Sequence, residues 1–75
     1  MKAVTEESSL SVRVYEELRR AILSGELAPG TLHSVVEISQ QLGVSRTPVR
    51  EALLQMATLG VVRVERRRGV RVRKV

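Results

Sequence analysis

Residues 34–53, SVVEISQQLGVSRTPVREAL, decide the fold of this chain. They open on Ser34-Val35-Val36-Glu37, the pattern of a capping box, in which the serine hydroxyl accepts from an amide of the first turn and the glutamate reaches back to the cap amide. Gly43 stands where the left-handed residue that ends a helix belongs. Pro48 suits the first turn of the next helix, where its missing N–H is not needed. A short helix, a tight turn and a second helix make a helix-turn-helix unit.

Both helices of this unit have one apolar face, because apolar residues recur at intervals of three and four. The first helix is expected to bury Val35, Ile38 and Leu42. The second starts at Ser45 or Thr47 and ends at Gly60, and its inner face is expected to carry Val49, Ala52, Leu53, Met56 and Leu59.

Upstream of this unit, the same periodicity begins near residue 10. Val14, Tyr15, Leu18, Ala21 and Ile22 form the inner face of a first helix, which Ser24-Gly25 ends, and Pro29-Gly30 makes a turn. Residues 1–9 are polar and without periodicity, so we expect a disordered N-terminal tail. The folded domain is therefore expected to span residues 10–75.

Downstream, the period changes from about 3.6 to 2. Val62 and Val64 alternate with charged residues, as do Val70 and Val72, and Arg66-Arg67-Arg68-Gly69 lies between them. This pattern predicts a two-stranded hairpin with a basic tip. Its valine face is expected to pack on the helices, with Val64 and Val72 in the core. Leu32 can add a short third strand beside it. The expected fold is mostly α with a small β-hairpin: a winged helix-turn-helix of three helices plus a wing.

The charge of the chain is strongly uneven. Residues 1–37 hold six acids and four bases, whereas residues 38–75 hold two acids and nine bases, within a total net charge of +5. Such asymmetry indicates a polyanionic partner, although a solvated basic surface is the plainer alternative. Tyr15 is the only aromatic residue, so the chain lacks the stacking platforms that read single strands. Double-stranded DNA fits better.

Other classes of function find little in the sequence. There is no cysteine and His33 is the only histidine, so we expect no metal site, no cofactor and no enzymatic activity. Apolar runs do not exceed three residues, which predicts no membrane span. Residues 1–7 lack an apolar stretch and carry acids, so we expect no signal peptide. The expected location is the cytoplasm.

The residues expected to contact DNA lie on the second helix of the unit and on the wing. Arg46 and Arg50 share a face, with Thr47 beside them. Arginine can donate two bonds to guanine, and threonine can bond to phosphate or touch a thymine methyl. The alternative is that Arg50 pairs with Glu51, Glu37 or another acid and only solvates that face. At the wing tip three adjacent arginines repel one another unless phosphates relieve the repulsion; a solvated turn is the alternative there.

Three stretches of the chain resemble the GntR family of bacterial transcription regulators, most closely its FadR-type branch: VYEELRRAILSGELAPG (residues 14–30), LGVSRTPVREAL (42–53) and RGV (68–70). The resemblance implies a winged-helix domain that acts as a dimer on a short palindromic operator. It also implies that Arg46, Thr47 and Arg50 contact DNA, that Ser45 contacts the backbone, and that the wing tip, Arg66, Arg67, Arg68 and Gly69, enters the minor groove.

The chain departs from the family pattern at two positions that matter for binding. Val36 stands where the family often has a basic residue, and Leu54 where a polar or basic one is common. The alternative function is therefore a protein-interaction module that uses the surface around Val36 and Leu54. The family's effector and dimerisation domain is absent from these 75 residues, so we expect this chain to be mostly monomeric and its full-length parent to be a homodimer.

Overall fold

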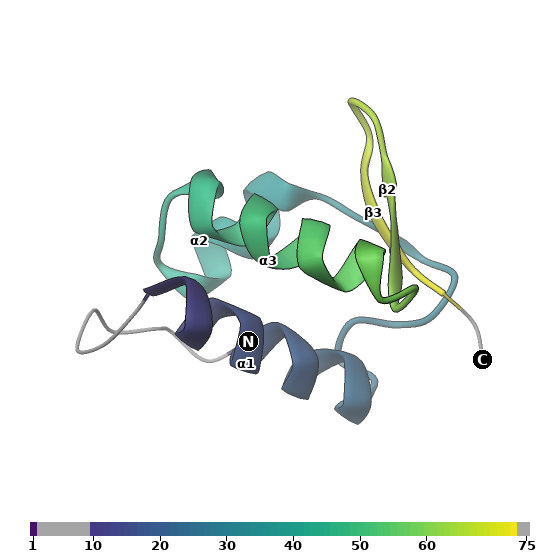
Figure 1. The fold of residues 1–75 in the computed structure, drawn as a ribbon, viewed down its shortest axis with the longest axis horizontal. Coiled ribbons are helices and arrows are strands. Elements are labelled where there is room, and N and C mark those ends of the chain that lie inside the picture. The colour runs from purple at the N-terminus through teal and green to yellow at the C-terminus, as the bar shows by residue number, and fades with distance from the viewer. Residues whose placement is uncertain (2–9, 74–75) are drawn as a thin grey trace.

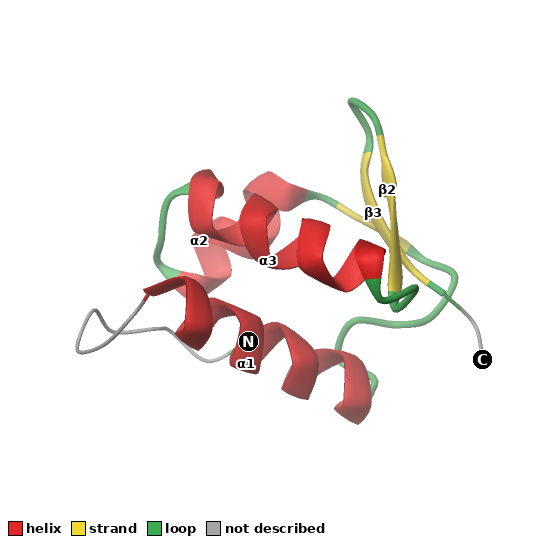
Figure 2. Ribbon diagram, viewed as in Figure 1, coloured by secondary structure: helices red, strands yellow, loops and turns green. Residues whose placement is uncertain are grey.

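The computed structural model of the chain describes Met1 and residues 10–73. Three helices lie together, and a hairpin projects beyond them (Figures 1 and 2). The elements are, in order, α1 (Leu10–Ser24), β1 (Leu32–His33), α2 (Val35–Leu42), α3 (Arg46–Thr58), β2 (Val62–Glu65) and β3 (Gly69–Val72). This arrangement confirms the predicted winged helix-turn-helix, including its short third strand. Within the predicted N-terminal tail, residues 2–9 lie outside the described residues, and Met1 is half-buried.

The core forms where α1 and α2 pack against α3 and the base of the hairpin closes the side. Burial follows the predicted faces of the helices. The buried apolar side chains are Val14, Leu18, Ala21, Leu27, Ile38, Leu42, Val49, Ala52, Leu53, Met56, Val62, Val70 and Val72. Tyr15, Ile22 and Val35 are partly buried against this cluster. The core therefore draws on every helix and both long strands.

Two predictions about the core are wrong. Leu59 was expected on the inner face of α3, yet 67% of its surface is exposed. The chain turns at Gly60, whose φ is +78°, so Leu59 lies past the last turn that packs on α1. Val64 was expected in the core, yet it is 45% exposed. The tip of the hairpin extends past the helices. In the valine pair nearest the tip, Val70 on β3 is buried, whereas Val64 on β2 is left open to solvent.

The turn between α2 and α3 sets the position of α3. The backbone N–H of Glu37 donates to the Ser34 hydroxyl at 3.4 Å, which caps α2 as predicted. Gly43 adopts φ 71°, and the N–H of Val44 donates to the carbonyl of Ser39 at 3.1 Å. These two features form a Schellman turn, which ends α2 in one defined direction. The direction in which the chain leaves α2 thereby sets where α3 begins.

The wing, defined as β2, β3 and the turn between them, belongs to an antiparallel sheet with strand order β1-β3-β2. Val62 pairs with Val72 and Val64 with Val70. Gly69 has φ +140°, and a Cβ atom there would lie 2.2 Å from the carbonyl oxygen of His33. Only glycine therefore lets β3 approach β1 this closely. The wing is thereby held against β1 through β3.

Candidate nucleic-acid interface

A groove of about 370 Å³ lies between the wing and the first turns of α2 and α3. The three parts of its wall lie far apart in sequence. Its lining residues are Ser34, Val35 and Val36 from the start of α2, Arg46, Arg50, Leu53 and Leu54 from α3, and residues 64–70 from the wing. The fold therefore brings the predicted residues of α3 and the predicted wing tip onto one surface.

Five arginines line this groove, and we call them the groove arginines: Arg46, Arg50, Arg66, Arg67 and Arg68. All five are exposed. Arg46 and Arg50 stand one turn apart on α3, about 6 Å along its axis. Within the part of the chain that the structure describes, none of the five makes a side-chain hydrogen bond or an ion pair. The alternative in which Arg50 pairs with Glu51 or Glu37 is therefore not what the structure contains.

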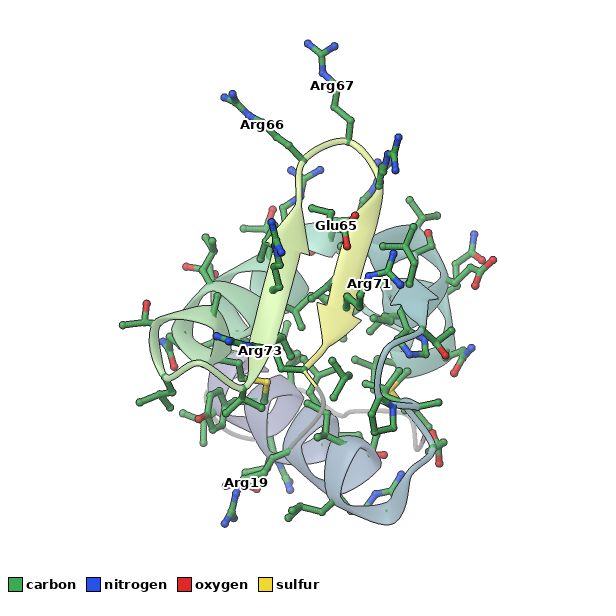
Figure 3. The ribbon with its side chains drawn as sticks, turned by 90° about the vertical axis from the view of Figure 1, so that its right-hand side faces the viewer. Arg19, Glu65, Arg66, Arg67, Arg71 and Arg73 are labelled. Carbon is green, nitrogen blue, oxygen red and sulfur yellow. The ribbon has the colours of Figure 1, made fainter. Side chains whose placement is uncertain are left out.

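The wing tip presents its arginines away from the body of the protein. Arg66 and Arg67 extend outward from the turn (Figure 3). The N–H of Arg68 donates to the carbonyl of Glu65 at 3.1 Å, which closes the turn. Arg67 adopts φ 65°, a left-handed conformation that side chains other than glycine seldom take. The turn therefore holds three like charges on a closed loop, at some cost in backbone strain.

Glu65, the one acid of the wing, also belongs to the groove lining, but its carboxylate is bound by Arg71. The Arg71 guanidinium donates from Nε to Glu65 Oε2 at 2.6 Å and from Nη1 to the Gly30 carbonyl at 2.6 Å (Figure 3). The hydrogen bond from Arg71 lowers the pKa of Glu65. The carboxylate is therefore neutralised by Arg71, a residue that the sequence did not single out. Only its three-dimensional placement beside Glu65 and Gly30 identifies Arg71 as an anchor of the wing.

The remaining predicted site residues have different positions. Ser45 precedes α3 in an extended conformation, and its side chain makes no capping hydrogen bond. Thr47 is exposed beside Arg46 but does not line the groove. Gly69 lies in the groove wall, half-buried, at the close approach to His33. The hydroxyls of Ser45 and Thr47 thus flank the groove arginines, and Gly69 shapes the wing.

The groove also contains aliphatic side chains that are open to solvent. Val36, Leu54 and Val64 line it and are 39%, 57% and 45% exposed. The sequence identified Val36 and Leu54 as departures from the family pattern, and it placed Val64 in the core. It gave no sign that all three share one surface with the arginines, because they come from three different elements.

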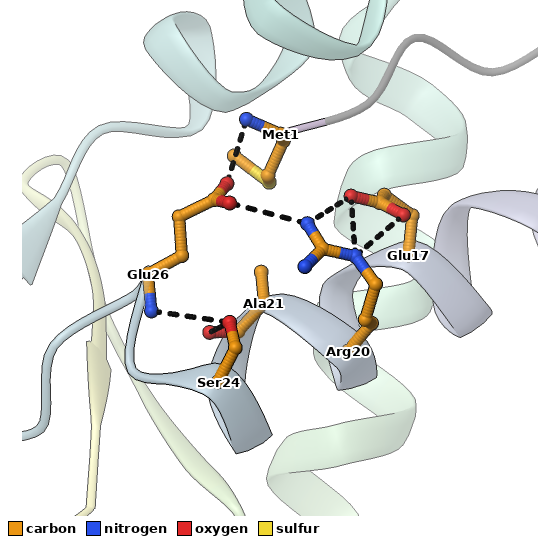
Figure 4. Close-up of polar contacts among 6 residues, drawn as sticks. All are labelled: Met1, Glu17, Arg20, Ala21, Ser24 and Glu26. Carbon is orange, nitrogen blue, oxygen red and sulfur yellow. Dashed lines mark hydrogen bonds and ion pairs between the residues drawn. The ribbon is translucent and has the colours of Figure 1, made fainter.

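On α1, away from the groove, acidic and basic groups pair with one another. Arg20 on α1 donates to Glu17 at 2.6 and 3.0 Å and to Glu26 at 3.2 Å, and the Met1 ammonium lies 2.6 Å from Glu26 (Figure 4). The Glu17 carboxylate, more than Glu26, raises the pKa of Arg20. Hydrogen bonds from the Met1 ammonium and then from Arg20 lower the pKa of Glu26. Acids and bases cancel here, away from the groove.

The described residues contain no group of three or more histidine, cysteine or acidic residues arranged to hold a metal ion. Among the helices of residues 10–73, none has the length and apolar character needed to cross a membrane.

Comparison with known proteins gives a consistent result. A sequence profile of the "Bacterial regulatory proteins, gntR family" matches residues 10–72. The chain is similar to the HTH-type transcriptional repressor RspR of Escherichia coli K12, with 41% identity over 84% of this chain and 28% of that protein. It is also similar to the gluconate operon transcriptional repressor of Bacillus subtilis 168, with 46% identity over 79% of this chain and 24% of that protein.

Among solved structures, the fold is similar to the DNA-binding domain of AraR in complex with operator ORE1. The TM-score is 0.72 and the identity 28%, over 83% of this chain and 77% of that one. The chain spans about a quarter of the length of the curated relatives it matches.

Proposed function

Because the chain belongs to the gntR family of bacterial regulatory proteins, we propose that it binds double-stranded operator DNA sequence-specifically, as the DNA-binding part of a transcription regulator. The observation that carries this function is the convergence of the five groove arginines on one surface, with no acidic partner among the described residues. The similar AraR domain, solved with its operator, and the two similar repressors agree with it.

In this function α3 enters the major groove. Arg46 and Arg50 donate to base edges, where a bidentate bond to guanine gives the strongest discrimination. Thr47 contacts a base or a phosphate beside them. Ser45 contacts the DNA backbone, which is supported by its exposed hydroxyl at the start of α3 and by the absence of a capping bond from that hydroxyl. Backbone amides at this helix end add attraction for a phosphate.

The wing carries the second set of contacts. Arg66, Arg67 and Arg68 neutralise phosphates or enter the adjacent minor groove, where the negative potential is strongest when the groove is narrow. Gly69 allows the wing to stand against β1. Arg71 binds Glu65, so the one carboxylate of the wing is paired and is not free to repel the DNA.

Two copies of the domain are proposed to bind one short palindromic operator. The buried apolar faces of the three helices are used in a single small core, so they are not available to hold a permanent dimer. We therefore expect this chain to sediment as a monomer at tens of micromolar, whereas the full-length parent is a homodimer. A tight dimer of the 75-residue chain would contradict this expectation.

The finer assignments are also proposals. Placement in the FadR-type branch rests on the sequence stretches 14–30, 42–53 and 68–70, and the sequence of the domain that follows in the parent would test it. A regulator that acts on DNA needs no enzymatic activity and no cofactor, and it works in the cytoplasm, where bacterial DNA is found.

A protein-interaction role for the surface around Val36 and Leu54 is less well supported. Both residues lie within the groove that the five arginines line. A protein partner would have to bury those cations as well, and uncompensated buried charge is costly. The duplex satisfies the arginines directly.

Salt dependence tests the proposal. For roughly five neutralised phosphates, the logarithm of the duplex association constant should fall with the logarithm of salt concentration with a slope of about −4 to −5. A titration of the chain against random and palindromic duplexes by fluorescence anisotropy measures this slope. No binding to any duplex at low salt would rule out the DNA-binding function.

A further inference from the structure

Three exposed aliphatic side chains converge in the groove beside the arginines. Val36 comes from α2, Leu54 from α3 and Val64 from β2. Isolated exposed aliphatic residues are ordinary on protein surfaces. Here, however, three elements each contribute one to the same wall, at the place where the cations gather. We call these three residues the aliphatic patch.

A ligand that covers this surface must offer anionic and apolar groups together. Duplex DNA offers phosphates for the guanidinium groups, and in its major groove the apolar group is the C5-methyl of thymine. Guanine and cytosine instead present acceptors or an amino donor there. A valine or leucine against those groups would leave them without a hydrogen-bond partner, which is unfavourable. The aliphatic patch therefore suits thymine and disfavours a G·C pair.

We infer that Val36 and Leu54 contact a thymine methyl group and make this chain prefer a thymine near the bases that Arg46 and Arg50 read. This inference rests on the proposed function. Val64, on the wing, closes the side of the groove. The residue that the sequence marks as a lost basic contact, Val36, thus becomes a determinant of specificity.

The spacing along α3 predicts where that thymine lies. Arg46, Arg50 and Leu54 follow one another at intervals of four residues, so they form one stripe about 12 Å long on the helix. Base pairs are stacked about 3.4 Å apart. A thymine that touches Leu54 is therefore expected within about four base pairs of the base that Arg46 reads.

The test starts from duplexes selected by the chain itself from a library with a random core. In the selected duplex, each thymine is replaced in turn by deoxyuridine, which lacks only the methyl group. We expect one replacement within four base pairs of the Arg46 contact to weaken binding of the wild-type chain about fourfold, the size expected for one methyl-sized contact. The same replacement should have no effect on the variant Val36→Ala, Leu54→Ala.

Matched controls come from exposed aliphatic residues outside the groove. Val12 and Leu59 are 52% and 67% exposed and do not line it. The variant Val12→Ala, Leu59→Ala should keep the full fourfold response to deoxyuridine. Circular dichroism of both variants checks that they are folded.

The outcomes separate the inference from the function on which it rests. Sequence-selective binding that is indifferent to deoxyuridine at every position would overturn the inference and leave the proposed function standing. A fourfold response that persists in Val36→Ala, Leu54→Ala would likewise overturn it. Failure to select any sequence from the library would remove the proposed function, and the inference with it.

Discussion

Arg20 on α1 and Arg50 on α3 are both exposed helical arginines, yet their surroundings are opposite. Arg20 is held by Glu17 and Glu26. Arg50 lines a groove with four other arginines and has no acidic partner in residues 10–73. In one region the charge is cancelled within the chain; in the other it is left for a ligand. Figure 3 shows the distance between the two regions: Arg66 and Arg67 at the wing tip, and Arg19 of α1 at the far end.

This difference shows that composition alone is a poor guide to a binding surface. The net charge of +5 is the difference between thirteen bases and eight acids, and what distinguishes the binding face is that its five arginines have no acidic partner among the described residues. Exposed ion pairs contribute little to stability, so the pairing on α1 serves mainly to remove charge from that side. The electrostatic potential therefore stays positive on the face of the groove arginines, and a positive potential steers polyanions to that face.

The largest effect is expected from the α3 arginines. Arg46→Ala and Arg50→Ala should each reduce the discrimination between operator and random duplex by about 1–3 kcal/mol, because each removes a bidentate base contact. Arg19→Ala, an exposed arginine of α1, is the matched control and should change nothing measurable. Binding to both duplexes by anisotropy checks this. Equal losses on operator and random DNA would identify Arg46 as a phosphate contact instead.

The wing tip should behave differently from α3. Changing Arg66, Arg67 and Arg68 together to alanine should weaken operator and random duplexes alike and reduce the magnitude of the salt slope by about 2–3, because phosphate contacts carry no sequence information. Arg63→Ala, which lies on β2 outside the groove lining, is the control. A loss confined to the operator would show instead that the tip reads bases.

Features of the fold that depend on residues close in sequence could be predicted, and features that depend on residues far apart in sequence could not. Ser34 and Gly43 act on their immediate neighbours, so the ends of α2 followed from sequence. Leu59 and Val64 fit the periodicity of a buried face, so the sequence predicts that both are buried. They are exposed because the neighbouring elements do not extend far enough to cover them. The anchor from Arg71 to the Gly30 carbonyl joins residues 41 apart, and no local pattern signals such a contact.

The candidate site follows the same rule. Arg46, Thr47 and Arg50 stand together on one helix, so their shared position was predictable. Whether Arg50 pairs with Glu51 or Glu37 depends on rotamers and on tertiary placement, and the sequence left both alternatives open. The groove joins α2, α3 and the wing, so its aliphatic patch emerges only when the three are folded together.

Acid should weaken the contact between Arg71 and Glu65 in the wing. The hydrogen bond from Arg71 lowers the pKa of Glu65 in the folded protein. Its contribution to stability is therefore present above the ordinary glutamate pKa and is lost as the pH falls through the lowered value. Glu65→Gln should be less stable than wild type at neutral pH, and the two should converge in acid.

Thermal unfolding between about pH 7 and pH 3 measures this convergence. Glu16→Gln is the control, because Glu16 is exposed on α1 and has no side-chain partner among the described residues. It should follow the wild-type curve. A constant offset between Glu65→Gln and wild type at every pH would mean that the Glu65 charge is not what holds the Arg71 anchor.

The smallest effect is expected at the turn of the wing. Arg67 is the one described residue other than glycine with a positive φ, at 65°. A left-handed conformation costs a residue that has a side chain about 1–2 kcal/mol. Glycine avoids this strain, but it loses more conformational entropy on folding, which costs about 0.5–1 kcal/mol. Arg67→Gly should therefore raise the free energy of unfolding by up to about 1.5 kcal/mol. Arg66→Gly and Arg68→Gly remove the same charge without relieving a positive φ, so urea unfolding should find them no more stable than wild type. If all three glycine variants gained equally, relief of charge repulsion at the tip, and not backbone strain at Arg67, would be the cause.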